Sequence, residues 1–234
     1  MNAAVESITW QGLVLSLLPA AIVVAIMVRW SAGAKTALYA TARMLIQLLL
    51  IGYVLVYIFE ADNPAIIVGV LTIMLAVASW ISIRPVQHKQ AHVFGHALLA
   101  ISVGGVLTLA LVSQVVIGVE PWFSPRYVIP LAGMIFAGAM NAVSLAAERL
   151  QAETGRGVAA PEARRIALQA SLIPIINSLF AVGVVALPGM MTGQILSGVS
   201  PLVAAKYQIV VMSMLFGVSG ISASLYVTLQ SRRI

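Results

Sequence analysis

Long apolar runs dominate this chain and leave few folds open to it. Each run is near the roughly 20 residues that a helix needs to cross the hydrocarbon of a bilayer. Only 9% of the 234 residues are charged, whereas a soluble domain carries roughly 25%. Because so few charged side chains cannot cover a water-facing surface, the chain is predicted to be an all-α integral membrane protein. We expect a polytopic bundle of about seven transmembrane helices in a single domain, residues 1–234.

The predicted spans follow one another with short connections. Their approximate bounds are 8–29, 37–59, 63–83, 94–118, 127–147, 170–187 and 203–229. Nearly all lysine and arginine residues fall on one side of this arrangement, and such an excess marks the cytoplasmic side. The N-terminus is therefore predicted to lie outside and the C-terminus inside. Topology thus explains the net charge of +6, and no nucleic-acid partner is expected.

Motifs typical of enzymes are missing from the sequence. It has no Gly-x-x-x-x-Gly-Lys-Ser/Thr phosphate loop, no His-Glu-x-x-His motif and no cysteine. All seven acidic residues lie outside the apolar runs or at their ends, which argues against acid–base catalysis within the membrane. No catalytic residue and no cofactor are predicted for the chain itself. Transport, with energy supplied from elsewhere, is the simpler interpretation.

A polar passage broken by glycine and proline lies between the last two apolar runs. It extends from Leu187 to Gly198 and contains Pro188, Gly189, Met190, Met191, Gly193 and Gln194. In a bilayer, the backbone can leave a helix only where its freed polar groups are satisfied. Pro188 removes a donor, and Gly189 and Gly193 permit unusual dihedral angles. The passage is predicted to be a hinge or outer gate. The alternative is a tight interhelical turn with a short interfacial helix.

Isolated polar side chains within the apolar runs are candidates for a transport pathway. They are costly in hydrocarbon and tend to face a bundle interior or a cavity. Arg43 and Gln47 share one helix face with Lys35 and Tyr39. This face is either a polar gate, or Arg43 snorkels to the interface while Gln47 makes one interhelical hydrogen bond. The other candidates are Asn141, Ser144, Asn177 and Ser178, whose alternative role is hydrogen bonding between packed helices.

Methionine and histidine each invite a metal-binding interpretation. The candidate thioethers are those of Met134, Met140, Met190 and Met191; they would favour Cu(I), although flexible packing is the commoner role of methionine. His88, His92 and His96 are spaced four apart and would form one stripe on a helix. His88 and His92 are near enough to share a metal ion, whereas His88 and His96 are about 12 Å apart. The alternative is a row of exposed or headgroup-facing histidines.

The stretch from about 148 to 169 has the composition of a soluble segment. Ala159 to Arg165 within it is predicted to be a short helix. Pro161 suits a first turn, because its missing N–H would have no partner there. Glu162 complements the positive end of the helix dipole. The segment is either a plain connecting loop or a docking element for a cytosolic partner.

Four motifs are similar to those of one known family. They are Arg43-Met44-Leu45-Ile46-Gln47-Leu48 with Gly52-Tyr53-Val54-Leu55, Ile129-Pro130-Leu131-Ala132-Gly133-Met134-Ile135, the Leu187–Gly198 passage, and Lys206-Tyr207-Gln208-Ile209. By these motifs the chain resembles the FetB-type permeases. This UPF0014 group contains membrane subunits of ATP-binding-cassette (ABC) transporters associated with iron export, and plant permeases tied to aluminium tolerance. The chain departs from the family pattern at Gly138, where the family usually has an amide.

The resemblance implies a multi-pass permease of the bacterial inner membrane. It would work as a homodimer with two copies of a separate ATPase, which binds ATP and Mg²⁺. The exported substrate would be a metal ion, with iron as the first candidate. The coupling helix would contain Val158, Ala159, Ala160, Pro161, Glu162, Ala163, Arg164 and Arg165. The residues alone leave open an ATP-independent channel or secondary transporter and a non-transporting scaffold. The resemblance to plant permeases leaves open ABC export of an organic substrate such as a nucleotide sugar.

Overall fold

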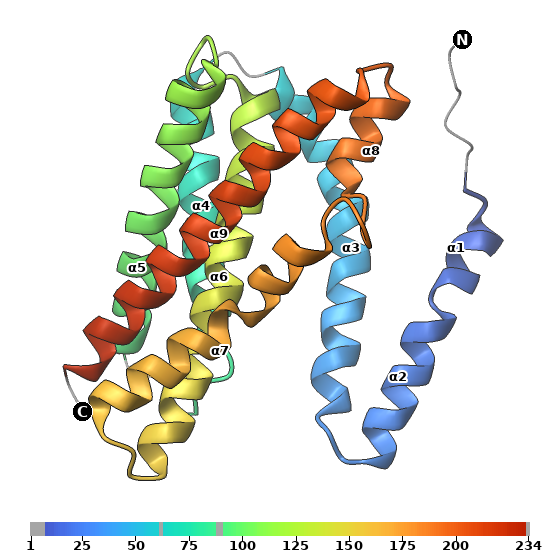
Figure 1. The fold of residues 1–234 in the computed structure, drawn as a ribbon. Coiled ribbons are helices and arrows are strands. Elements are labelled where there is room, and N and C mark those ends of the chain that lie inside the picture. Colours follow the sequence, from blue (N-terminus) through green and yellow to red (C-terminus); the bar gives the residue numbers. More distant parts are fainter. Residues whose placement is uncertain (1–7, 61–62, 88–90, 233–234) are drawn as a thin grey trace. The chain divides into compact units, whose positions relative to one another are not determined.

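The computed structural model describes residues 8–60, 63–87 and 91–232 (Figure 1). The chain divides into two compact units, residues 1–60 and 61–234. Apart from an isolated bridge between Val182 and Ala186, the described residues form helices and turns. The all-α architecture predicted from the apolar runs is confirmed.

The first unit contains α1 (Trp10–Ser16), α2 (Leu18–Arg29) and α3 (Ala34–Phe59). The break between α1 and α2 lies next to Pro19, in the first turn of α2. A proline has no N–H and so cannot continue the hydrogen bonds of the preceding helix. Helix α2 packs on α3, yet no residue of the three helices is buried. Their apolar side chains are suited to contact with lipid, which covers such surfaces in the hydrocarbon of a bilayer.

The second unit is built around two long helices, α6 (Pro125–Gly155) and α9 (Pro201–Ser231). The others are α4 (Pro64–Ser82), α5 (Ala91–Ala110), the π-helix η1 (Leu111–Ile117), α7 (Ala160–Ala181) and α8 (Gly189–Leu196). Helix α6 packs against α4, α5, α7 and α9, and α9 also contacts α5, α7 and α8. The core of this unit therefore lies around α6 and α9.

Small residues let the central helices approach closely, as is common between transmembrane helices. A Cβ atom at Gly104 of α5 would collide with the hydroxyl of Ser222 on α9, and one at Gly105 would lie 2.8 Å from the Phe136 ring of α6. The Ser219 hydroxyl of α9 donates a hydrogen bond of 3.4 Å to the Gly138 carbonyl of α6. These contacts hold α5, α6 and α9 in one register.

Among the described residues, six helices are long and apolar enough to cross a membrane. They are Trp10–Arg29, Ala34–Phe59, Pro64–Ser82, Ala91–Ile117, Pro125–Gly155 and Pro201–Ser231. Each corresponds to a predicted span. The remaining predicted span, 170–187, falls on α7 and the turn after it. The prediction of one helix through residue 187 is wrong, because α7 ends at Ala181.

The turn between α7 and α8 satisfies much of its own backbone. Gly183 adopts a left-handed conformation with φ 83°. The N–H groups of Val184, Val185 and Ala186 all donate to the Ala181 carbonyl, and the Gly183 N–H donates to the Ala186 carbonyl. Internal satisfaction of this kind is the condition for a chain to leave a helix at membrane depth.

Helix α6 is longer than its predicted span. Its 31 residues rise by ~46 Å, more than the ~30 Å of hydrocarbon in a bilayer. Because α6 continues to Gly155 and α7 begins at Ala160, most of the 148–169 stretch is helical. The predicted short helix from Ala159 to Arg165 is not a separate element but the first turns of α7.

Candidate transport pathway

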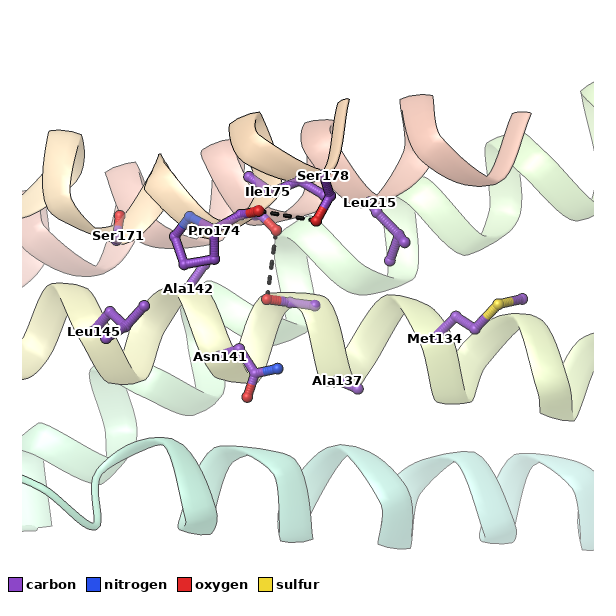
Figure 2. A pocket seen from close by; sticks show the side chains of 12 residues that line it. Met134, Ala137, Asn141, Ala142, Leu145, Ser171, Pro174, Ile175, Ser178 and Leu215 are labelled. Atoms are coloured by element: carbon purple, nitrogen blue, oxygen red, sulfur yellow. Dashed lines mark hydrogen bonds between the residues drawn. The ribbon is translucent and has the colours of Figure 1, made fainter. Parts of the chain in front are cut away.

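A pocket of about 320 Å³, here called the Asn141 pocket, lies among α6, α7 and α9 (Figure 2). Met134, Ala137, Asn141 and Leu145 line it from α6, because residues three or four apart share a helix face. The other lining residues are Gly138 and Ala142 of α6, Ser171, Pro174, Ile175 and Ser178 of α7, and Leu215 and Ser219 of α9. The pocket is therefore mostly apolar, with an amide and three hydroxyl groups.

The hydroxyl groups of this pocket leave oxygen lone pairs for a ligand. The Ser178 hydroxyl donates to the Pro174 carbonyl at 2.9 Å, and the Ser219 hydroxyl donates to the Gly138 carbonyl (Figure 2). Each donor is thus used internally, whereas the oxygens keep capacity to accept. Pro174 lies inside α7, where it cannot give the Ala170 carbonyl its usual helical partner. The pocket offers weak, neutral oxygen groups.

A second pocket of about 380 Å³, here called the Arg126 pocket, lies among α6, α8 and α9. Its polar side chains are Arg126, Tyr127, Gln194 and Tyr207. The remaining lining residues are Ile117, Pro130, Leu131, Met134, Met190, Val199, Val203, Val210 and Val211. The Gln194 Oε1 atom is buried and has no hydrogen-bond partner among the described residues.

The two pockets meet at Met134, which lines both of them. From this residue the Arg126 pocket follows α6 toward its first turn, and the Asn141 pocket follows it toward Leu145. Helix α9 accompanies both, with Tyr207 at one pocket and Ser219 at the other. The two pockets thus follow one another along α6, with the Met134 side chain between them.

The structure gathers some of the predicted pathway residues and separates others. Asn141 and Ser178 line the Asn141 pocket, and Met190 and Gln194 line the Arg126 pocket. Met191 lines a third pocket of about 370 Å³ beside Gln208. Ser144, Asn177 and Met140 line none of these three pockets.

The glycines of the predicted hinge have ordinary helical roles. Pro188 is the N-cap of α8 with φ −64°, and Gly189 and Gly193 are residues of that helix. Both glycines are therefore helical here, and a hinge or outer gate in this passage stays a prediction. Between Ala181 and Pro201 the left-handed glycines are Gly183 and Gly198, with φ 83° and 91°, so the positions that need glycine lie before and after α8.

Arg43 and Gln47 lie on α3, in the unit of residues 1–60, with Lys35 and Tyr39 on the same helix. Arg43 is half-buried, whereas the other three are exposed. The pockets belong to the unit of residues 61–234. A role for Arg43 and Gln47 in the pathway therefore stays a prediction.

The predicted docking residues form an exposed turn on a buried base. Pro161, Glu162 and Arg165 are exposed, whereas Ala163 is fully buried. The Arg165 guanidinium donates hydrogen bonds of 2.6 and 2.9 Å to the two Glu162 carboxylate oxygens. These bonds, with the positive charge of Arg165, lower the pKa of Glu162. The remaining predicted residues are Val158, Ala159, Ala160 and Arg164, of which Ala159 is exposed and the others are half-buried.

Sequence reasoning missed Glu153, which anchors the end of α6. Its side chain is only 6% exposed and pairs with Arg149 at 2.7 Å and with Arg156 at 3.3 Å. The Glu153 carbonyl also accepts the Val158 N–H across the turn to α7. An acidic residue near the end of a long helix gave no signal of burial, because the sequence does not show that α7 folds back over it.

The histidine stripe is used in packing where the structure describes it. The His92 and His96 rings lie edge to face on α5, 5.7 Å apart. The His96 Nδ1 atom is 2.9 Å from Gln230 Oε1 on α9, which indicates a hydrogen bond between these helices. His88 lies outside the described residues, so a metal site shared by His88 and His92 stays a hypothesis. Within the described ranges, no group of three His, Cys, Asp or Glu residues could hold a metal ion.

Comparison with known proteins gives similarities along almost the whole chain. Residues 10–234 match the model of the Uncharacterised protein family (UPF0014). The chain is 36% identical to a UPF0014 membrane protein of Synechocystis sp., over 91% of this chain and 88% of that protein. It is 34% identical to the probable iron export permease protein FetB of Escherichia coli, over 93% of this chain and 88% of that protein. It is 38% identical to UPF0014 membrane protein STAR2 of Oryza sativa, over 80% of this chain and 70% of that protein. No solved structure matches.

Proposed function

Because this chain belongs to the UPF0014 family of multi-pass membrane proteins, we propose that it is the permease subunit of an ABC exporter. Two copies would form the membrane part, and two copies of a separate ATPase would bind ATP and Mg²⁺ in the cytosol. The cargo would contain a metal ion, and iron is the first candidate. The name of the Escherichia coli relative, a probable iron export permease, supports this choice.

One observation carries the proposal most directly. The Asn141 and Arg126 pockets meet at Met134 and follow α6 through its apolar part. Polar side chains within apolar runs tend to face a cavity or a bundle interior, and Asn141 and Ser178 both line a pocket here. Weak, neutral oxygen groups suit a transporter, which must release what it binds.

The exposed first turn of α7 supports the docking of an ATPase. Pro161, Glu162 and Arg165 project from a turn whose Ala163 is buried, and the Glu153 cluster joins this turn to α6. A partner that moved the turn would therefore also move α6, which lines both pockets.

Iron movement in inside-out vesicles tests the proposal. The vesicles contain this chain with its candidate ATPase, and iron in the lumen is measured with and without ATP. Accumulation only with ATP is expected. Accumulation without ATP would favour a channel or secondary transporter. Strong stimulation of the ATPase without iron movement would keep the ABC class and point to an organic substrate.

A pair of arginine and lysine variants tests the docking turn. Arg165→Ala removes an exposed charge from the α7 turn, whereas Lys206→Ala removes one from the first turns of α9. We expect Arg165→Ala to reduce stimulation of the ATPase and Lys206→Ala to leave it unchanged, with both variants inserted normally in the membrane. Equal stimulation by both variants would place the docking surface elsewhere.

A further inference from the structure

We propose that the Arg126 pocket binds an oxyanion that carries a neighbouring hydroxyl group, and that the metal ion is exported in complex with such an anion. The second part rests on the proposed function, because it names the chemical form of the cargo. The first part concerns the pocket itself, which at about 380 Å³ falls within the usual range for small-molecule sites.

The charge of the pathway disfavours a bare cation. Arg126 is the one charged side chain among the described residues that line the Asn141 and Arg126 pockets, and no acidic side chain lines either pocket. In the part of the chain that the structure describes, Arg126 has no carboxylate within ion-pair distance. The acidic residue nearest in sequence, Glu120, is exposed and lies outside the lining.

Arg126 is exposed at the first turn of α6, and a multivalent cation in the pocket would meet this positive guanidinium and no opposite charge among the described lining residues. A carboxylate or phosphate would instead receive charge-assisted hydrogen bonds from Arg126. The electrostatics of the pocket therefore select an oxyanion.

The amide of Gln194 adds a second requirement. Its Oε1 atom is buried and has no hydrogen-bond partner among the described residues. A carbonyl oxygen of this kind can only accept, and leaving it unpaired is unfavourable. An ionised carboxylate also only accepts, so it can pair with the Nε2 group of Gln194 but not with this oxygen. A hydroxyl group on the same ligand can, and so the two residues together recognise an oxyanion beside a hydroxyl.

This chemistry fits the transport of a hard metal ion. Such ions prefer carboxylate, carbonyl and water oxygens, yet the described residues hold no cluster of acidic and histidine ligands for one. An ion that arrives with its own ligands needs no such cluster. A hydroxycarboxylate such as citrate offers both carboxylate and hydroxyl oxygens to a metal, and its outer oxygens remain available to Arg126 and Gln194. Sugar phosphates share the oxyanion and the hydroxyl and are the alternative source.

Equilibrium dialysis with the purified full-length chain in lipid nanodiscs tests the site. The probes are citrate, tricarballylate (which is citrate without its hydroxyl), glucose 1-phosphate and ferrous ion alone. We expect citrate to bind, and Arg126→Gln to weaken its affinity by about tenfold or more, as for loss of a charged hydrogen bond. Arg126→Lys should retain part of the affinity. Lys206→Gln is the matched control, because Lys206 precedes the pocket residue Tyr207 but does not line the pocket.

The tricarballylate comparison isolates Gln194. The wild-type chain should prefer citrate over tricarballylate by about fivefold, the range of one neutral hydrogen bond, and Gln194→Leu should abolish this preference. Binding of glucose 1-phosphate but not citrate, with the same dependence on Arg126, would support the oxyanion site and assign it to sugar phosphates. Citrate affinity that is equal in wild type and Arg126→Gln would overturn the proposal, as would ferrous ion binding more tightly than every anion.

Transport with two labels separates this proposal from the proposed function. In the vesicles with ATPase and ATP, iron and citrate should accumulate together. Iron that accumulates without citrate or glucose 1-phosphate would refute the complex as cargo and leave the ABC exporter intact. Oxyanion binding that depends on Arg126, with no stimulation of the ATPase by this chain, would refute the ABC exporter and keep the binding site.

Discussion

Two arginines share one buried carboxylate where α6 turns back toward α7. Glu153 accepts from Arg149 and Arg156, and its own backbone carbonyl holds Val158. Removal of the charge would leave the arginines, one of them with a buried Nε atom that already lacks a partner, without their acceptor. Glu153 and its two arginines therefore stabilise the turn between α6 and α7.

Glu153→Gln is therefore expected to destabilise the protein by about 1–3 kcal/mol, the usual cost of breaking a buried charged hydrogen bond. Thermal unfolding in detergent measures the change as a lower Tm. Glu148→Gln is the control, since Glu148 is exposed on the same helix, and its Tm should remain near that of the wild type. An equal fall for both variants would mean that net charge, rather than the Glu153 cluster, sets the stability.

Met134 separates two pockets with a side chain that is flexible and apolar. Met134→Phe would place a rigid ring at the junction, and overpacking of this kind costs about 1–3 kcal/mol. If this cost raises the free energy of the state in which substrate passes Met134, transport should slow by about tenfold or more. Met140→Phe on the same helix is the control, because Met140 lines neither pocket. Transport rates in vesicles distinguish the two, and equal rates would remove Met134 from the pathway.

At the scale of elements, the broken crossing between residues 160 and 196 depends on glycine conformation. Gly183 has φ 83°, and a Cβ atom there would meet nothing within 4 Å. Any loss of stability on substitution would therefore come from the backbone alone. Gly189 also has open space around it, but it lies in the first turn of α8.

Gly183→Ala should cost about 1–2 kcal/mol, the penalty of a left-handed conformation for an L-residue. Gly189→Ala should be neutral or slightly stabilising, since alanine favours a helix over glycine by about 0.5–1 kcal/mol. The two Tm values in detergent give the comparison. A larger loss at Gly189 than at Gly183 would contradict the assignment of the turn.

Most helices could be predicted from the sequence, because each apolar run of the right length has one stable form in a bilayer. The end of α7 could not, since Val182 to Leu187 are as apolar as the helix before them. Only the left-handed Gly183 and the bonds to the Ala181 carbonyl show the turn. Asn141 and Ser178 were predicted because they are polar within apolar runs, whereas Ser144 and Asn177 satisfy the same criterion but line neither pocket. The same criterion gives no signal for Arg126, which lies just outside the predicted span 127–147.

For the whole molecule, α7 and α8 together accompany α6 along its length. Helix α7 meets the Asn141 pocket at the middle of α6, and α8 meets the Arg126 pocket near its start. Among the described residues there are six long apolar helices, and the broken segment packs on two of them, α6 and α9, within the unit of residues 61–234. We expect this segment to be a seventh crossing, which would put the two chain termini on opposite sides of the membrane.

Single cysteines test this topology, because the chain has none of its own. A maleimide that cannot cross the membrane is applied to intact cells. It should label Glu60→Cys, Glu120→Cys and Ser197→Cys, and it should reach Ser31→Cys, Gln87→Cys and Glu162→Cys only after the cells are opened. Labelling of positions 162 and 197 from the same side would show that α7 and α8 do not cross.

The unbroken length of α6 has a mechanical consequence. An α-helix is stiff along its axis, and this one begins at the Arg126 pocket and ends at the Glu153 cluster. We expect it to behave as a rod: an axial shift at Gly155 would reach Arg126 through the helix itself, without a relay of side chains between them. Pro130, the proline inside α6, is the joint where the rod can flex. A movement of α6 at one face of the membrane would then reach the other face directly.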